Sequence, residues 1–220
     1  KGQLVLKITI LCTDSAHPVN AYLESWVENL GDFHTIDLVR SRTQLSDGDF
    51  LFLVSCSEII TSEHRKKYRH TLVLHASDLP RGRGWSPHVW EVVNGADVIT
   101  LSLLEAEDKV DSGRVWLKRS IPIAKTALWF EVNQKLFQAE IELMNEAVEM
   151  YGGIKPYPQP EEIEATYYPK RTPSDSEIDP NKPISDQFDL IRMCDPQRYP
   201  AWFDYLGQKY KIILEKIDHE

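Results

Sequence analysis

The segment LVLKITILC, residues 4–12, is apolar and rich in β-branched side chains, and the polar run Thr13-Asp14-Ser15 follows it directly. A short apolar run that stops at turn-forming residues is typical of a buried strand that leads into a loop. Residues 18–30 then carry apolar side chains at nearly helical spacing, and Gly31 is a suitable helix end. We therefore predict a strand, a loop and a helix in that order.

The same alternation continues to residue 94. We predict strands at 34–39, 50–55 and 71–75, one or two helical turns at 62–69, and a helix at 86–94. This rhythm is typical of a Rossmann-like α/β fold, with a mostly parallel twisted sheet and helices on both faces.

Ligands of such sheets gather at the carboxyl ends of the strands. We therefore expect the loops at 13–17, 55–58 and 75–84 to converge on one site.

Two further strands are predicted at 98–104 and 115–123, on either side of the acidic turn 105–113. The longest helix is predicted at 123–151, where apolar side chains recur every three or four residues. This stripe, which we assign to core packing, consists of Leu128, Val132, Leu136, Ala139, Leu143, Ala147 and Met150.

The chain changes character after Gly153, because seven of its 13 prolines fall between Pro156 and Pro183. Such a stretch is expected to be extended and irregular. A short helix at 186–193 and a hairpin at 202–217 follow. We therefore divide the chain into a main domain, residues 1–153, and a proline-rich strap with a small C-terminal helix and hairpin, residues 154–220.

The composition is that of a soluble globular protein, with 42% hydrophobic and 27% charged residues. The net charge of −9 argues against a nucleic-acid partner, because phosphate recognition needs clustered Lys and Arg. Three widely spaced cysteines indicate reduced thiols in a cytoplasmic protein. The nine-residue apolar run near the start is too short to cross a membrane.

The stretch most informative about chemistry is HASDLPRGRGWSP, residues 75–87, which begins at a predicted strand end. Pro80, Gly82 and Gly84 make it a sharply turned, rigid loop. A histidine at such a place can exchange protons near neutral pH.

This stretch resembles the signature loop of the folate-dependent formyltransferases, which include methionyl-tRNA, glycinamide-ribonucleotide and sugar formyltransferases. The matching positions are His75, Ser77, Leu79, Pro80, Arg81, Arg83, Gly84 and Pro87. A second family element, Asp-Ser-Gly before a strand, is matched by Asp111-Ser112-Gly113. The run YPKRTP at 168–173 looks like the strap of sugar-nucleotide formyltransferases, so the resemblance spans about residues 71–207.

The resemblance implies acyl transfer from N10-formyltetrahydrofolate to an amine, without a metal. It implies that His75 takes or relays the proton of the amine, and that Asp111 orients His75 and favours its charged form. It also implies that the folate lies between two loops and is held mainly by their backbone groups. These positions are Cys56, Ser57, Glu58, Ile59, Asp108, Lys109 and Val110.

One position departs from the family pattern. Family members have an Asn two residues before the His, and this chain has Val73 there. In the family that amide helps to hold the developing oxyanion, and the loss of one such donor raises the barrier by about 2.7–4 kcal/mol. Either this chain supports the oxyanion through His75 and other donors, or it is inactive.

The acceptor expected from the strap is a nucleotide-linked amino sugar, for example in a surface-glycan pathway such as pseudaminic acid synthesis. We expect Trp85 and Trp90 to pack the helix at 86–94 and leave the sugar nucleotide to other residues. The candidate substrate-binding residues are Asp14, Ser77, Arg81, Arg83, Lys170 and Arg171.

Other functions remain open at this point. The acceptor could be an aminoacyl group on a carrier protein, water could replace the amine in a hydrolase, or the chain could be an inactive folate- or sugar-nucleotide-binding scaffold. The chain could also form a homodimer.

Overall fold

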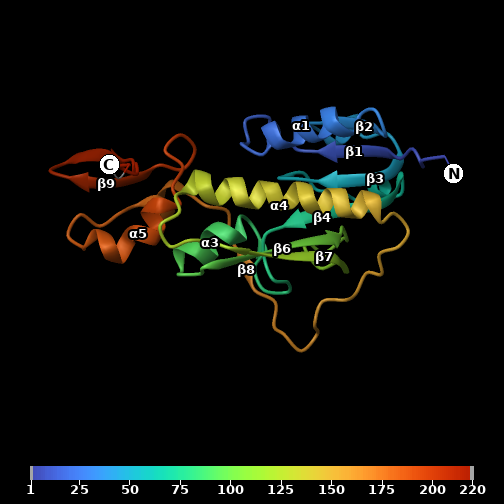
Figure 1. The fold of residues 1–220 in the computed structure, drawn as a ribbon. Helices are drawn as coiled ribbons and strands as arrows, with labels where there is room; N and C mark the ends of the chain where they lie inside the picture. Colours follow the sequence, from blue (N-terminus) through green and yellow to red (C-terminus); the bar gives the residue numbers. More distant parts are fainter. Residues whose placement is uncertain (1, 219–220) are drawn as a thin grey trace.

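A computed structural model of the chain describes residues 2–218 (Figure 1). Its main sheet has six strands in the order β2-β1-β3-β4-β6-β7. The strands are β1 (Lys7–Leu11), β2 (Thr35–Val39), β3 (Gly48–Leu53), β4 (Tyr68–His75), β6 (Val98–Glu105) and β7 (Val115–Pro122). The ladders from β2 to β4 are parallel, and those of β6 with β4 and β7 are antiparallel.

The helices are α1 (Asn20–Leu30), α2 (Ser62–Arg65), α3 (Pro87–Val93), α4 (Trp129–Glu149) and α5 (Ile184–Arg192), with 3-10 turns at Arg42–Gln44 and Pro173–Ser176. Figure 1 shows the long α4 lying along the sheet, with α1 and α3 at either side of it.

Strand alternation gives the sheet two apolar faces. One face carries Ile8, Ile10, Phe50 and Phe52, which share the main core with the apolar residues of α1, α3 and α4. The other carries Leu11, Leu51 and Leu53, which form a smaller cluster with Leu45, Ile60, Tyr68 and the partly buried Val73. The Rossmann-like, mostly parallel fold class is thus confirmed, although α1, α3 and α4 all pack on one face of the sheet.

The predicted start of the longest helix, residue 123, is six residues too early. The buried guanidinium of Arg192 donates hydrogen bonds to the carbonyls of Ala124 and Ala127, which holds this segment as a turn. The carboxylate of Glu131 then accepts from the Leu128 amide and caps the true start of α4. Residues 123–128 therefore remain outside the helix, because Arg192 of the C-terminal appendage (the α5 helix and the hairpin that follows it) holds the carbonyls of Ala124 and Ala127.

Strand β4 begins at Tyr68 and not at residue 71, so the predicted helical turns at 62–69 shorten to Ser62–Arg65. The Tyr68 hydroxyl bonds to Thr9 and accepts from the Ser46 amide, which fixes the first residue of β4 in the sheet.

The strap leaves the end of α4 and passes along the main domain to the signature loop (Figure 1). There β8 (Tyr167–Tyr168) pairs in parallel with β5 (Arg83–Gly84), a ladder that the sequence did not predict. The predicted hairpin is β9 (Ala201–Tyr205) and β10 (Gln208–Ile212). It shares a separate small core with α5, built on Ile178, Ile191, Cys194 and Ala201. Among residues 2–218, no helix is long and apolar enough to cross a membrane.

Candidate active site

The parallel strands β1, β3 and β4 end at the same edge of the sheet, so the loops that follow them meet there, as predicted. His75 is the last residue of β4. Its side chain is only 7% exposed, because the signature loop folds back over it. Nε2 of His75 lies 2.7 Å from the Gly82 carbonyl oxygen, and Nδ1 lies 3.7 Å from Oδ1 of Asp111.

Asp111 reaches His75 from the turn between β6 and β7. Its backbone lies in the left-handed region, at φ 54°, and its Oδ2 accepts a 2.8 Å hydrogen bond from the Gly84 amide. Gly113 is required two residues later, because any Cβ there would collide with the Glu105 carbonyl. The Asp-Ser-Gly element therefore has a geometric reason: it turns the chain tightly and leaves the Asp111 carboxylate directed at the signature loop.

Both ring nitrogens of His75 face groups that can only accept. The Gly82 carbonyl requires a proton on Nε2, and the Asp111 carboxylate favours one on Nδ1. Each ring nitrogen therefore faces a group that can accept its proton, so the site can accommodate the imidazolium that forms when His75 takes up a second proton. A positive charge that is buried beside a reacting carbonyl is suited to support negative charge on its oxygen.

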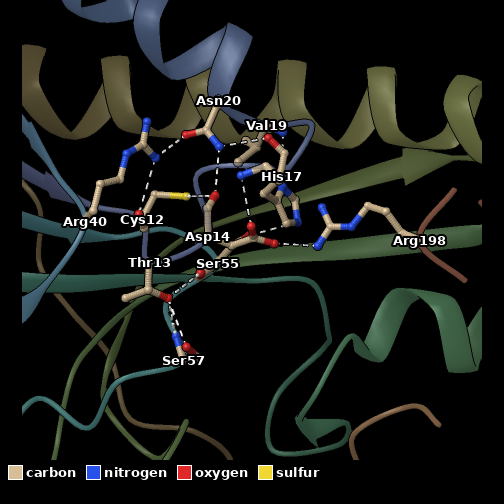
Figure 2. Close-up of polar contacts among 11 residues, drawn as sticks. Cys12, Thr13, Asp14, His17, Val19, Asn20, Arg40, Ser55, Ser57 and Arg198 are labelled. Atoms are coloured by element: carbon tan, nitrogen blue, oxygen red, sulfur yellow. Dashed lines mark hydrogen bonds and ion pairs between the residues drawn. The ribbon is translucent and has the colours of Figure 1, made fainter.

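The loops after β1 and β3 are joined to each other by hydrogen bonds (Figure 2). Thr13 Oγ1 accepts from the Ser57 amide at 2.9 Å. His17 Nδ1 accepts from the Val19 amide, and its Nε2 bonds to the Ser55 hydroxyl at 3.2 Å. Burial, with the nearby Arg198, lowers the pKa of His17 to about 4, so this histidine is neutral at pH 7.

Asp14 lies in the same loop and is paired with the appendage. Its Oδ2 is 2.6 Å from Nη2 of Arg198, as Figure 2 shows. The residues are 184 positions apart, so this contact connects the C-terminal appendage to the first loop of the main domain. Burial favours the neutral acid, but the Ala16 amide and Arg198 outweigh it and lower the pKa of Asp14.

The two loops predicted to hold folate lie together. Arg65 donates to the Ile60 carbonyl at 2.8 Å and to Asp108 at 2.6 Å, and so bridges them. Ile59 and Val110, one on each loop, are 76% and 61% exposed. Beneath the loops, Cys56, Val73 and Ala106 line the edge of the smaller apolar cluster.

The side chains at these two loops are therefore apolar or already take part in contacts within the protein. Burial raises the pKa of the Cys56 thiol to about 11, so it is protonated at neutral pH. Glu58 accepts from the Arg42 amide at 3.2 Å, and the Lys109 carbonyl accepts from Ser112. Side chains of this kind suit a flat heteroaromatic ring whose polar edge bonds to backbone groups, so the residues present fit a pterin.

Comparison with known proteins decides the family. Residues 34–148 match the family model described as formyl transferase, which is more than half of the chain. The chain belongs to the formyl transferase family. It is accordingly a formyl-transferring enzyme, of a family in which dependence on folate is typical.

Solved structures of formyltransferases share its fold. Methionyl-tRNA formyltransferase from Clostridium thermocellum is 21% identical, with a TM-score of 0.78, over 95% of this chain and 97% of that one. A sugar N-formyltransferase from a Shewanella species is 14% identical, with a TM-score of 0.73, over 98% and 99%. HypX from Aquifex aeolicus in complex with tetrahydrofolic acid is 22% identical, with a TM-score of 0.77, over 94% of this chain and 37% of that one.

The six predicted substrate-binding residues of this formyltransferase are not equally accessible. Arg81 and Lys170 are exposed, and Lys170 Nζ lies 5.2 Å from the centre of the Trp85 ring. Arg171 lies over the Tyr199 ring, 4.4 Å from its centre, at the junction with the appendage.

Arg83 and Ser77 are buried in the signature loop. Arg83 donates to Gln159 at 2.7 Å and to the Tyr167 hydroxyl at 3.2 Å, and only 7% of the residue is exposed. Ser77 is fully buried, and within residues 2–218 its hydroxyl has no hydrogen-bond partner. Both side chains point into the protein, so we assign them to the loop's internal structure and do not retain them as diphosphate ligands.

The two tryptophans also differ. Trp90 stacks on Tyr168 and donates to the Pro169 carbonyl at 3.1 Å, so it packs the strap as expected of a structural residue. Trp85 precedes α3 and is 44% exposed, so the expectation that it packs the helix is wrong.

Sequence reasoning missed several residues near the site. Gln159 bonds to both the signature loop and the Asp111 turn, and Arg198 reaches Asp14. His88, in the first turn of α3, is buried with Arg171 nearby, and these two effects lower its pKa to about 3. None of these residues belongs to a sequence motif. Gln159 is brought inward because the strap pairs with the signature loop. No group of three or more His, Cys, Asp or Glu within the described residues is arranged to hold a metal ion.

Proposed function

We propose that this enzyme transfers the formyl group of N10-formyltetrahydrofolate to the amine of a nucleotide-linked amino sugar. The buried His75–Asp111 pair, at the edge where three loops meet, is the observation that carries the proposal. An acid–base group beside a carboxylate that orients it is what acyl transfer to an amine requires.

The folate would supply the formyl carbon and leave as its free amine, which takes up the proton that the acceptor amine loses. The residues of the chain would move that proton and support the charge on the formyl oxygen. To accept the proton that the attacking amine loses, His75 must be neutral, with its one proton on Nδ1 directed at Asp111 and with Nε2 unprotonated. Nε2 now bonds to the Gly82 carbonyl, so the acceptor must take the place of that bond. The imidazolium formed in this way faces Asp111 and offsets negative charge on the formyl oxygen.

Because Val73 stands where the family has an Asn, the positive charge on His75 becomes more important for stabilising the oxyanion. The Val73 side chain belongs to an apolar cluster with Cys56 and Ala106, and so offers no donor where the family has an amide. A cation can replace a lost neutral donor, because hydrogen bonds to charged groups are roughly twice as strong. We propose that charged His75 is the principal side-chain support for the oxyanion.

The folate ring would bind over Val73, between the loop that carries Ile59 and the loop that carries Val110. These exposed apolar side chains and the Arg65 bridge between the loops support that position. Backbone groups of residues 56–59 and 108–110 would bond to the polar edge of the ring.

For the acceptor, the exposed Trp85 and Lys170 are the main support. Trp85 lies in the signature loop and Lys170 in the strap, and the Lys170 ammonium lies over the Trp85 indole. An aromatic face can stack on a nucleobase, and an ammonium can pair with a phosphate. The net charge of −9 makes a whole tRNA a poor acceptor.

A direct test is formyl transfer to a panel of UDP- and dTDP-linked amino sugars, with free amino sugars and an aminoacyl carrier protein as the comparison. We expect turnover with at least one nucleotide-linked amino sugar and little with the free sugars. Turnover only with the aminoacyl carrier protein would overturn the proposed acceptor.

A further inference from the structure

Gln159 is the residue of the strap that enters the active-site loops. It lies between α4 and β8 and is only 9% exposed. The neighbouring Tyr157 exchanges two backbone hydrogen bonds with Val115, at 2.8 and 3.0 Å, which fixes this part of the strap to the first residue of β7. Gln159 is thus held beside the Asp111 turn by backbone contacts that do not depend on its own side chain.

Both ends of the Gln159 side-chain amide are hydrogen-bonded. Its Oε1 accepts from Arg83 Nη2 at 2.7 Å, and its Nε2 donates to the carbonyls of Asp111 and Gly113 at 2.8 and 2.9 Å. Arginine can only donate and backbone carbonyls can only accept, so these contacts fix which end of the amide faces which group. A buried amide with three satisfied bonds is a rigid connector.

The groups that Gln159 joins belong to the two halves of the catalytic pair. Arg83 lies between Gly82 and Gly84, whose carbonyl and amide bond to His75 and Asp111. The carbonyls of Asp111 and Gly113 flank the turn in which Asp111 holds its left-handed conformation. Gln159 therefore ties the loop that covers His75 to the turn that carries Asp111.

We propose that Gln159 is a positioning residue that sets the distance and direction between Asp111 and His75. Its side chain touches neither the His75 ring nor the Asp111 carboxylate, and it acts through the Arg83 side chain on one side and through the carbonyls of the Asp111 turn on the other. This inference rests on the proposed function of the pair, because it assigns Gln159 a role in the activity of the same site. This role matters because Val73 offers the oxyanion no hydrogen-bond donor, so the charge on His75 must support more of the negative charge.

The test combines kinetics with NMR of the histidine rings in protein labelled with 15N-histidine. In Gln159→Ala we expect kcat to fall by about ten- to a hundredfold, as small misplacements of catalytic groups do. The KM for the folate donor should change by no more than about threefold, because Gln159 is buried and is not among the residues proposed to hold folate. The ring nitrogen signals of His75 should move in the direction seen for Asp111→Asn.

Two further variants keep the test decisive. Gln159→Glu keeps the shape and the acceptor for Arg83, but it places a carboxylate oxygen against two carbonyls, so it should move the same signals even if Gln159→Ala does not fold. Gln187→Ala is the matched control, because Gln187 also bonds to backbone groups, those of Asp179, but lies in the appendage. We expect this control to leave kcat and the His75 signals unchanged.

Unchanged His75 signals and unchanged kcat in a folded Gln159→Ala or Gln159→Glu protein would overturn the positioning role. If instead the wild-type enzyme transfers formyl to none of the acceptors, the proposed function fails. The NMR comparison still decides the role of Gln159 in that case, because it needs no turnover.

Discussion

Oδ1 of Asp111 lies 3.7 Å from Nδ1 of His75, and both side chains are less than a tenth exposed. The two residues come from different parts of the sheet, the end of β4 and the turn after β6, and each is also bonded to the signature loop. At this distance the carboxylate can orient the imidazole and pair with the imidazolium that forms when His75 accepts a proton. Removing that negative charge should therefore alter catalysis more than it alters the fold.

We expect Asp111→Asn to lower kcat by about a hundredfold or more, because the amide keeps the shape but loses the charge that supports the imidazolium. Steady-state kinetics with the folate donor and a competent acceptor would measure this. Glu107→Gln is the matched control, since Glu107 is an exposed carboxylate on the same turn and has no assigned role in the site. An Asp111→Asn enzyme with normal kcat would reduce Asp111 to a turn residue.

Restoring the family amide should not improve this enzyme. Val73 packs in an apolar cluster, so Val73→Asn would bury an amide at a cost of about 1–3 kcal/mol if it is left unpaired. Thermal or denaturant unfolding should show the loss, and kcat should not rise. A higher kcat in Val73→Asn would mean that the amide reaches the reacting carbonyl and that our account of the oxyanion is wrong.

The acceptor site can be tested at Lys170. We expect Lys170→Ala to raise the KM for the nucleotide-linked amino sugar by about three- to tenfold, with little change in the KM for folate, because an exposed cation of this kind contributes modestly. Lys182→Ala, which removes another exposed lysine of the same half of the chain, should change neither value. Equal effects of Lys170→Ala on both substrates would place Lys170 outside the acceptor site.

The buried carboxyl group of Glu140 allows a prediction of how the free energy of unfolding depends on pH. Burial within α4 raises its pKa from 4.5 to about 8, so the folded protein keeps a proton that the unfolded chain loses. The free energy of unfolding should therefore fall as the pH rises from about 4.5 to about 8. Glu140→Gln cannot ionise, and its unfolding free energy should fall less over that range, whereas the exposed Glu149→Gln should follow the wild type. Identical pH curves for wild type and Glu140→Gln would contradict this.

The sequence predicted the sheet and the signature loop because both depend on local patterns. Alternating strands and helices, and the turn residues Pro80, Gly82 and Gly84, are visible in short windows of the chain. The expectation that His75 and Asp111 lie together in space is also correct, although it rested only on the family resemblance. The catalytic roles of these two residues stay predictions until the variants above are measured.

Contacts between distant segments could not be predicted in this way. Gln159, Arg192 and Arg198 resemble ordinary polar residues of an irregular tail, yet each bonds to the main domain across a long separation. Arg83 was assigned to the substrate for the same reason, since nothing in the sequence indicates that β8 covers it. A single sequence does not record such pairings, because they depend on where the strap runs.

The central claim is that His75 transfers protons for a formyl transfer from folate to a nucleotide-linked amino sugar. Its most direct test is single-turnover transfer of a 13C-labelled formyl group, with wild type and His75→Ala compared at equal folate occupancy. We expect the label on the sugar nitrogen with the wild type, and a rate at least about a hundredfold lower for a folded His75→Ala that still binds folate. Transfer at a near-normal rate by His75→Ala would contradict the account.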